Sequence, residues 1–237
     1  MHIAEGIQIV DLGIFLEKEN LLAFSDVHLG YEEALTKQGI LIPKFHFKDL
    51  VLRLEKMIQA VKPRVIVVNG DLKHEFGTIS DDEWRNALKL IDFLRKNCEE
   101  LVLLKGNHDK MMDPIACKRD MKAVKEHVAG DVMFCHGDFV PFIPDNVKTI
   151  VIGHEHPAVR VREGVRSEKF KCFLHGKWDG KQLIVLPSMN LLTEGTDVAS
   201  ELVMSPFLKR DLSDFDVWIV ADKIYEFGKL KKIEKMK

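Results

Sequence analysis

LVLLKGNHD, residues 101–109, joins an apolar run to a compact polar cluster. Four consecutive apolar positions are typical of a short strand that is buried on both faces, as in a parallel sheet. The cluster holds a glycine, an amide, an imidazole and a carboxylate, which suit a tight turn and can also bind metal. In open α/β sheets, ligands bind outside the carboxyl ends of the strands. This segment therefore predicts both a fold class and the place of a site.

The same succession of an apolar run and a polar cluster occurs five times. The pairs are Leu21–Phe24 with Asp26-Val27-His28, Val65–Val68 with Asn69-Gly70-Asp71, Leu101–Leu104 with Gly106-Asn107-His108-Asp109, Val132–Cys135 with His136-Gly137-Asp138, and Thr149–Ile152 with Gly153-His154-Glu155-His156. We expect the five clusters to converge at one sheet edge. In the first and last clusters the ligand-type side chains are two residues apart, which predicts that both point to the same side of an extended segment.

Helix-like segments lie between the early runs. Phe47–Val61 has apolar residues at helical spacing, and Pro63 follows and ends the pattern. Ser80–Glu83 fits the S-x-x-E capping box, and an amphipathic pattern continues from Trp84. Helices between buried strands favour βαβ units and an α/β class.

The pattern changes after Pro157, where short strand-like segments predominate. Asp179-Gly180 supplies a hairpin turn between two of them. Lys229–Lys237 is basic and is expected to form a solvated tail. We expect this β-rich part to pack as a second sheet against the first, so that residues 1–237 form a single domain.

Composition excludes several classes of protein. The chain has 237 residues, 46% apolar and 30% charged, as in an ordinary soluble globular protein. Its formal charge of −2 argues against a strongly basic surface, so any nucleic-acid binding is expected to be weak and local. Met1–Val10 lacks the pattern of a signal peptide, and no apolar run reaches the roughly 18 residues that span a bilayer. We expect a cytoplasmic protein without a membrane partner, and the four scattered cysteines fit a reducing compartment.

The polar clusters together form a set of metal ligands. The oxygen donors are Asp26, Asp71 and Asn107, and the imidazole donors are His28, His136, His154 and His156. A mixed set of this kind suits Mn²⁺, Fe²⁺ or Zn²⁺ better than Ca²⁺ or Mg²⁺ alone. Seven ligands are too many for one ion, whereas two ions that share a carboxylate would use them all. Two metals about 3.5 to 4 Å apart are suited to in-line displacement at phosphorus.

The order D-x-H, G-D, G-N-H-D, H-G-D and G-H-x-H resembles the signature of the calcineurin-like metallophosphoesterases over residues 20–157. Within that superfamily the chain is most similar to small archaeal phosphoesterases related to the nucleases Mre11 and SbcD, and bacterial ligase-associated phosphoesterases are similar too. His74 supports this relation, because Mre11-type nucleases carry a histidine three residues after the aspartate that matches Asp71. The sequence has no room for their capping domain, so a processive double-strand-break nuclease is not expected.

The resemblance implies a four-layer α/β/β/α sandwich of two mixed β-sheets flanked by helices. It also implies that Asp26, His28 and His156 hold one metal, that Asn107, His136 and His154 hold the other, and that Asp71 bridges them. His108 would face the substrate, and His74 is a second candidate catalytic residue or else caps a turn. Asp109 has two open interpretations, since it either orients His108 or is a turn residue.

We therefore expect an enzyme that hydrolyses phosphodiester bonds by in-line attack of a hydroxide bridging two divalent ions, with Mn²⁺ as the first candidate and Fe²⁺ and Zn²⁺ as alternatives. DNA, RNA and nucleotides are the candidate substrate classes. Two other functions stay open: a phosphomonoesterase or nucleotide pyrophosphohydrolase at the same site, and a binding scaffold without catalysis. The sequence predicts neither the natural substrate nor the oligomeric state.

Overall fold

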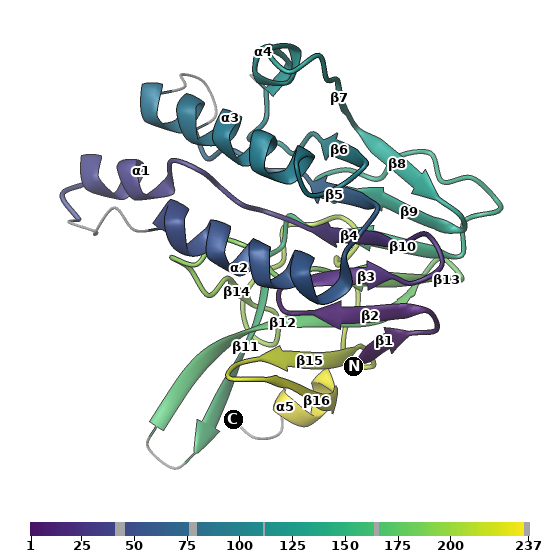
Figure 1. The fold of residues 1–237 in the computed structure, drawn as a ribbon. Helices are drawn as coiled ribbons and strands as arrows, with labels where there is room; N and C mark the ends of the chain where they lie inside the picture. The colour runs from purple at the N-terminus through teal and green to yellow at the C-terminus, as the bar shows by residue number, and fades with distance from the viewer. Residues whose placement is uncertain (41–45, 76–79, 111, 164–165, 235–237) are drawn as a thin grey trace.

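Two β-sheets stacked face to face form the centre of the molecule (Figure 1). The computed structural model describes residues 1–40, 46–75, 80–110, 112–163 and 166–234. Within these residues the first sheet has seven strands in chain order: β1 (His2–Ala4), β2 (Ile7–Val10), β3 (Gly13–Leu16), β4 (Leu21–Phe24), β5 (Val65–Asn69), β6 (Glu100–Leu104) and β7 (Ala123–Val124). Strands β1 to β4 pair antiparallel and β4 to β7 pair parallel, so the sheet is mixed.

The second sheet is also mixed and contains nine strands of the described chain. They are β8 (Glu126–Ala129), β9 (Val132–Cys135), β10 (Thr149–Ile152), β11 (Pro157–Glu163), β12 (Arg166–Trp178), β13 (Lys181–Val185), β14 (Thr196–Asp197), β15 (Asp216–Val220) and β16 (Ile224–Lys229). Their order is β14-β11-β12-β13-β10-β9-β8, with β15 paired to β12 and β16 paired to β15. The parallel pairs are β9 with β10, β10 with β13, and β11 with β14.

Three clusters of buried apolar side chains separate four layers. The helices of the described chain are α1 (Tyr31–Lys37), α2 (His46–Val61), α3 (Asp81–Arg95), α4 (Met112–Cys117) and α5 (Leu230–Glu234), and none is long and apolar enough to cross a membrane. Leu54 of α2 and Leu90 of α3 pack on the outer face of the first sheet. Phe134 lies in the cluster between the sheets. Phe207 and Ile233 cover the outer face of the second sheet. The predicted α/β/β/α sandwich is confirmed, although its fourth layer is mostly irregular chain.

The five apolar runs predicted as strands are confirmed as β4, β5, β6, β9 and β10. The expected convergence at the edge of one sheet is wrong in detail, because β9 and β10 belong to the second sheet. The carboxyl ends of β4 to β6 in the first sheet and of β9 and β10 in the second still lie together. The Nδ2 amide of Asn69 at the end of β5 donates to the carbonyl of Cys135 at the end of β9 over 3.0 Å. Both sheets therefore contribute loops to one site.

Other local predictions are also confirmed. Helix α2 covers the predicted segment, and α3 begins after Ser80, whose hydroxyl accepts from the Glu83 N–H at 3.0 Å. Asp179 and Gly180 have φ angles of 47° and 77° and join β12 to β13 as an antiparallel hairpin. The helix cap and the hairpin turn each depend on the backbone preferences of the residues that form them, so both could be predicted from the sequence.

The predicted solvated tail is wrong over the part that the structure describes. Residues 230–234 form helix α5, and Leu230 and Ile233 are each only 1% exposed. The lysines between them face solvent, so the segment is an amphipathic turn of helix rather than a charged tail. Residues 235–237 of the predicted tail lie outside the described residues.

We predict that Ile233→Ala lowers the free energy of unfolding by about 2 to 5 kcal/mol, because it leaves a cavity under the second sheet. Lys232→Ala is the matched control at the neighbouring exposed position, and it should change the stability by less than about 0.5 kcal/mol. Urea denaturation of both variants measures the difference. Equal and small effects would show that α5 does not belong to the core.

Candidate metal centre

Two groups of ligand-type side chains lie where strands of both sheets end. The first group is Asp26, His28 and His156, and the second is Asp71, His136 and His154. Within each group the potential ligand atoms all lie within 4.8 Å of one another. The side chains come from loops that follow β4, β5, β9 and β10, so residues far apart in the sequence meet at one place.

Asp71 and Asn107 complete the set. Oδ2 of Asp71 lies 3.7 Å from Nε2 of His28 in the first group and 3.3 Å from Nε2 of His136 in the second. Oδ1 of Asn107, in the loop after β6, lies 3.0 Å from the same His136 nitrogen. All seven predicted ligands are thus brought together, with the Asp71 carboxylate between the two groups.

The chemistry of the donors fits metal ions. Nε2 of His28 is 3.1 Å from Nε2 of His156, and Nε2 of His136 is 3.2 Å from Nδ1 of His154. Two ring nitrogens at such a distance can share only one proton, and a cation bound by both would satisfy both lone pairs. Imidazole, carboxylate and amide oxygen are the donors preferred by first-row divalent ions.

The loop backbones differ from the sequence prediction. Five of the seven residues have left-handed backbone conformations, with φ between 46° and 67°: Asp26, His28, Asp71, His154 and His156. The predicted extended segments are therefore wrong, and the side chains converge because the chain turns at each ligand. Such a conformation costs of order 1–3 kcal/mol for a residue other than glycine. Hydrogen bonds between loops offset this cost, for example from the His28 N–H to the Asp71 carbonyl at 2.9 Å.

Two glycines allow this close approach. A Cβ atom on Gly106 would lie 2.0 Å from Oδ1 of Asp71, and one on Gly153 would lie 1.8 Å from Oγ of Ser25 and 2.6 Å from Oδ2 of Asp26. Any larger residue would displace a carboxylate, so these glycines are needed for space.

Electrostatics favour a charged cluster even without metal. Burial disfavours ionisation of Asp26, but the neighbouring His156 and His136 outweigh it and lower the pKa of that carboxyl to about 2. Burial likewise disfavours a charge on His136, but its hydrogen bond to Asp71 and the charge of Asp26 raise the pKa of His136 to about 9. Burial and the nearby His156 and His136 lower the pKa values of His28 and His154, respectively. His136 therefore carries a proton at neutral pH, and a metal ion bound by this imidazole would displace it.

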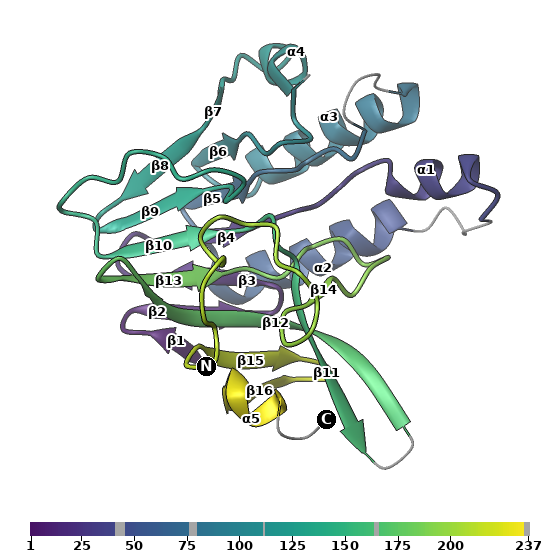
Figure 2. The ribbon, with the colours of Figure 1, turned by 180° about the vertical axis from the view of Figure 1, so that it is seen from behind.

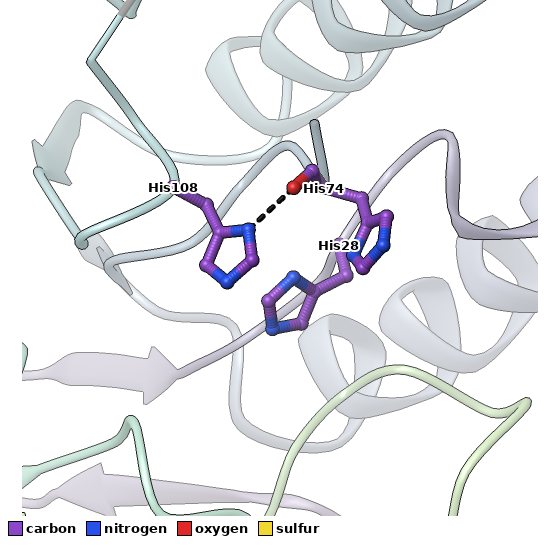
Figure 3. Close-up of side chains that lie close together, drawn as sticks. All are labelled: His28, His74 and His108. Carbon is purple, nitrogen blue, oxygen red and sulfur yellow. Dashed lines mark hydrogen bonds between the residues drawn. The ribbon is translucent and has the colours of Figure 1, made fainter. Parts of the chain in front are cut away.

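The candidate catalytic residues His108 and His74 lie beside the first group (Figure 3). The main-chain N–H of His108 donates to Oδ1 of Asp71 at 2.9 Å, and its Nε2 lies 3.9 Å from Oδ2 of that carboxylate. Its Nδ1 forms a hydrogen bond with the main-chain carbonyl of His74. The two rings are stacked, with centroids 5.5 Å apart. His28, His74 and His108 also lie close enough to form a third potential ligand group.

Asp109 and Glu83 have roles that the sequence did not indicate. The Asp109 carboxylate accepts from the N–H groups of Gly106 at 3.0 Å and of Leu72 and Lys73 at 3.3 Å. The bond to Gly106 supports the interpretation of Asp109 as a turn residue, and the bonds to Leu72 and Lys73 were not foreseen. Burial and the charge of Asp71 raise the pKa of Asp109 to about 6. Asp109 therefore ties the loop after β5 to the loop after β6.

Glu83 holds the other side of the same loop. Its Oε1 accepts from the N–H groups of His74 at 2.9 Å and Glu75 at 3.3 Å. The capping-box pattern identified Glu83 as a residue of the first helical turn, but it did not show that the carboxylate reaches a distant loop. Glu83 thus fixes the segment whose carbonyl contacts His108.

Comparison with known proteins agrees with this geometry. The model of the family described as calcineurin-like phosphoesterase matches residues 20–156. The chain belongs to this family. The resemblance to the calcineurin-like metallophosphoesterases and the predicted enzyme class, a metal-dependent phosphoesterase, are confirmed. No curated protein matches the chain.

Solved structures with the same fold include the nuclease MPE from Pseudomonas putida, with a TM-score of 0.66 at 19% identity, over 92% of this chain and 93% of that one. The phosphoesterase Yfce from E. coli matches over 83% of this chain and 86% of its own, at 13% identity and a TM-score of 0.39. The similarity to the nuclease MPE supports the assignment of the fold, whereas the similarity to Yfce is too low to support it further.

We predict that metal affinity rises by up to about tenfold per pH unit between pH 7 and 9, because one proton leaves as metal binds. His136 has a pKa of about 9, so it is protonated below that pH and neutral above it, where the affinity should level off. His28 and His154 have lowered pKa values and are already neutral in this range. Competition of Zn²⁺ with a coloured chelator measures the affinity at each pH. A constant affinity would contradict the assignment of His136.

Proposed function

We propose that the chain hydrolyses phosphodiesters at a dinuclear metal centre. Asp26, His28 and His156 would hold one ion, Asn107, His136 and His154 would hold the other, and Asp71 would be shared. The observation that carries this proposal is the place of Asp71 Oδ2, at 3.7 Å from a nitrogen of one group and 3.3 Å from a nitrogen of the other. A single carboxylate oxygen between two sets of donors suits a bridging ligand.

The donor set supports Mn²⁺, Fe²⁺ or Zn²⁺ as the ions. When bound, two such ions would polarise the phosphoryl group and lower the pKa of water at the site. The residues of the chain contribute negative charge from Asp26 and Asp71, which are 0% and 2% exposed and so act in a surrounding of low dielectric. Two divalent ions would outweigh the two carboxylates by two positive charges, and a site with that net charge accommodates an anionic phosphate ester.

His108 is placed to act on the substrate. A carbonyl can only accept, so the bond to the His74 carbonyl fixes the proton on Nδ1 of His108. When the ring is protonated, Nε2 can then donate to a phosphoryl oxygen or to the leaving group. His74 acts mainly through its backbone in this arrangement, and its stacked ring limits the motion of His108.

Diesters are proposed as substrates in preference to monoesters because a nuclease shares the fold of this chain. The test is hydrolysis of bis-para-nitrophenyl phosphate and para-nitrophenyl phosphate by Mn²⁺-loaded protein, together with the metal content. Faster turnover of the diester with two metals per chain supports the proposal. Turnover of the monoester alone would favour a phosphomonoesterase, and a chain that binds no metal would favour a scaffold.

We predict that Asp71→Asn lowers metal content and abolishes turnover together. The substitution removes a shared ligand from both ions and leaves more positive charge uncompensated. Metal analysis and diester hydrolysis measure the two effects, and Asp145→Asn at an exposed position is the control. Two retained metals with normal turnover would refute the bridging role.

We predict that His108→Ala keeps both metals and loses turnover by roughly 10²- to 10⁴-fold, the range of general acid–base catalysis. The loss should be smaller for a diester with an acidic leaving group such as para-nitrophenol, because that oxygen hardly needs a proton. An equally large loss there would mean that His108 stabilises the phosphoryl oxygens instead. A fall in metal content would make His108 a ligand.

A further inference from the structure

A long β-hairpin leads away from the candidate metal centre. Strand β11 begins at Pro157, directly after the ligand His156, and pairs antiparallel with the first half of β12. Figures 1 and 2, which view the molecule from opposite sides, both show the hairpin extending beyond the two sheets. At about 3.3 Å per residue, Arg162 near its tip lies roughly 20 Å along the strand from His156.

One face of this hairpin is basic. Residues directly opposite each other in antiparallel strands point to the same face. Arg160 pairs with Lys169, Arg162 with Ser167, and Ala158 with Lys171. The exposed Arg162, the half-buried Arg160 and Lys169 and, at the inner end, the largely buried Lys171 therefore share this face without a carboxylate of the hairpin, and we call it the basic face. The full sequence of the hairpin, residues 157–171, has five basic and two acidic residues in a chain whose formal charge is −2.

The opposite face has a different character. Val159 is buried in the core on the outer side of the second sheet, and Val161 and Phe170 pack against that core. Glu168 pairs with Val161 and so lies on this apolar face. Arg166 is adjacent to Ser167 and therefore also points to this side. The two faces of the hairpin thus differ in charge, and the core anchors one of them.

The basic face connects to the site at its inner end. Nζ of Lys171 donates to the carbonyl of Ser188 at 2.9 Å, and Oγ of Ser188 donates to the carbonyl of Asp26 at 2.7 Å. Further out, Lys169 lies 3.1 Å from Oε1 of Glu201, and Nε of Arg160 lies 4.0 Å from Oδ2 of Asp197. These acids offset part of the charge in the middle. Arg162 is exposed and lies beyond them.

We propose that the basic face binds the sugar-phosphate backbone of a nucleic-acid strand whose scissile phosphate lies at the metal centre. This inference rests on the proposed function. A single nucleotide at the metals cannot also reach an arginine roughly 20 Å along the strand, whereas a polynucleotide places a phosphate at every few ångströms of its length. The expectation that nucleic-acid binding is weak and local followed from the net charge, which does not reveal this local excess of cations.

The test compares two exposed arginines near the hairpin tip. Arg162→Ala removes a charge from the basic face, and Arg166→Ala removes the same charge from the opposite face. Mn²⁺-loaded proteins are assayed on a single-stranded oligodeoxynucleotide at several salt concentrations and on bis-para-nitrophenyl phosphate. Arg162→Ala should raise the KM for the oligonucleotide several-fold at unchanged kcat. It should also reduce the slope of log affinity against log salt by about 0.7, the value for one lost phosphate contact with a single strand.

The controls separate this inference from the proposed function. Arg166→Ala should leave the oligonucleotide KM unchanged, Arg162→Glu should raise it more than Arg162→Ala, and all variants should hydrolyse bis-para-nitrophenyl phosphate normally. Equal effects of Arg162→Ala and Arg166→Ala, or no effect of either, would overturn the inference. A wild-type protein that hydrolyses the small diester but does not bind the oligonucleotide would overturn the inference alone. Failure on both substrates would overturn the proposed function.

Discussion

Two buried carboxylates, Asp26 and Asp71, constrain the whole end of the sandwich at which the strands terminate. A buried charge is costly unless it is paired and hydrogen-bonded. Among the residues that the structure describes, these carboxylates pair with imidazoles on loops from both sheets. The loops must therefore meet within hydrogen-bonding distance, which requires the two sheets to stack with their carboxyl ends together. The glycines at 106 and 153 and the turned backbones at the ligands follow from the same requirement.

The parts of the fold that were predictable from the sequence are those with local signals. The β-branched run at Val65–Val68, the cap at Ser80 and the Asp179-Gly180 turn each determine their own backbone, and the structure agrees with all three. Periodicity identifies a strand but not its partner, so the place of β9 and β10 in the second sheet could not be derived. Strands β1 and β2, with the sequences HIA and IQIV, were not predicted because a polar residue interrupts the apolar run, and β3 (GIFL) has only three apolar residues after its glycine. Helix α5 was not predicted, because its exposed lysines made the segment resemble a charged tail.

The candidate site divides in the same way. Its ligand-type residues could be selected from the sequence because five similar clusters occurred in order, each behind a strand. The residues that hold those clusters in place could not. Apart from the bond between Asp109 and Gly106 in the same turn, Asp109 and Glu83 act through hydrogen bonds to backbone groups 8 to 37 positions away, and no short motif encodes such a contact. The left-handed conformation at the ligands could not be predicted either, since Asp and His adopt a positive φ more often than most residues but still only in a small fraction of cases.

The left-handed backbone at five ligand positions also has an evolutionary consequence. At His28, His154 and His156 glycine would relieve this backbone strain without removing a carboxylate. Loss of a ligand can therefore stabilise the fold, so thermodynamic stability and retention of the metal centre are in conflict. In a lineage released from selection for turnover, mutation would lead toward stable, metal-free descendants of the same shape. The requirements of folding alone therefore do not account for the intact set of ligands in this chain.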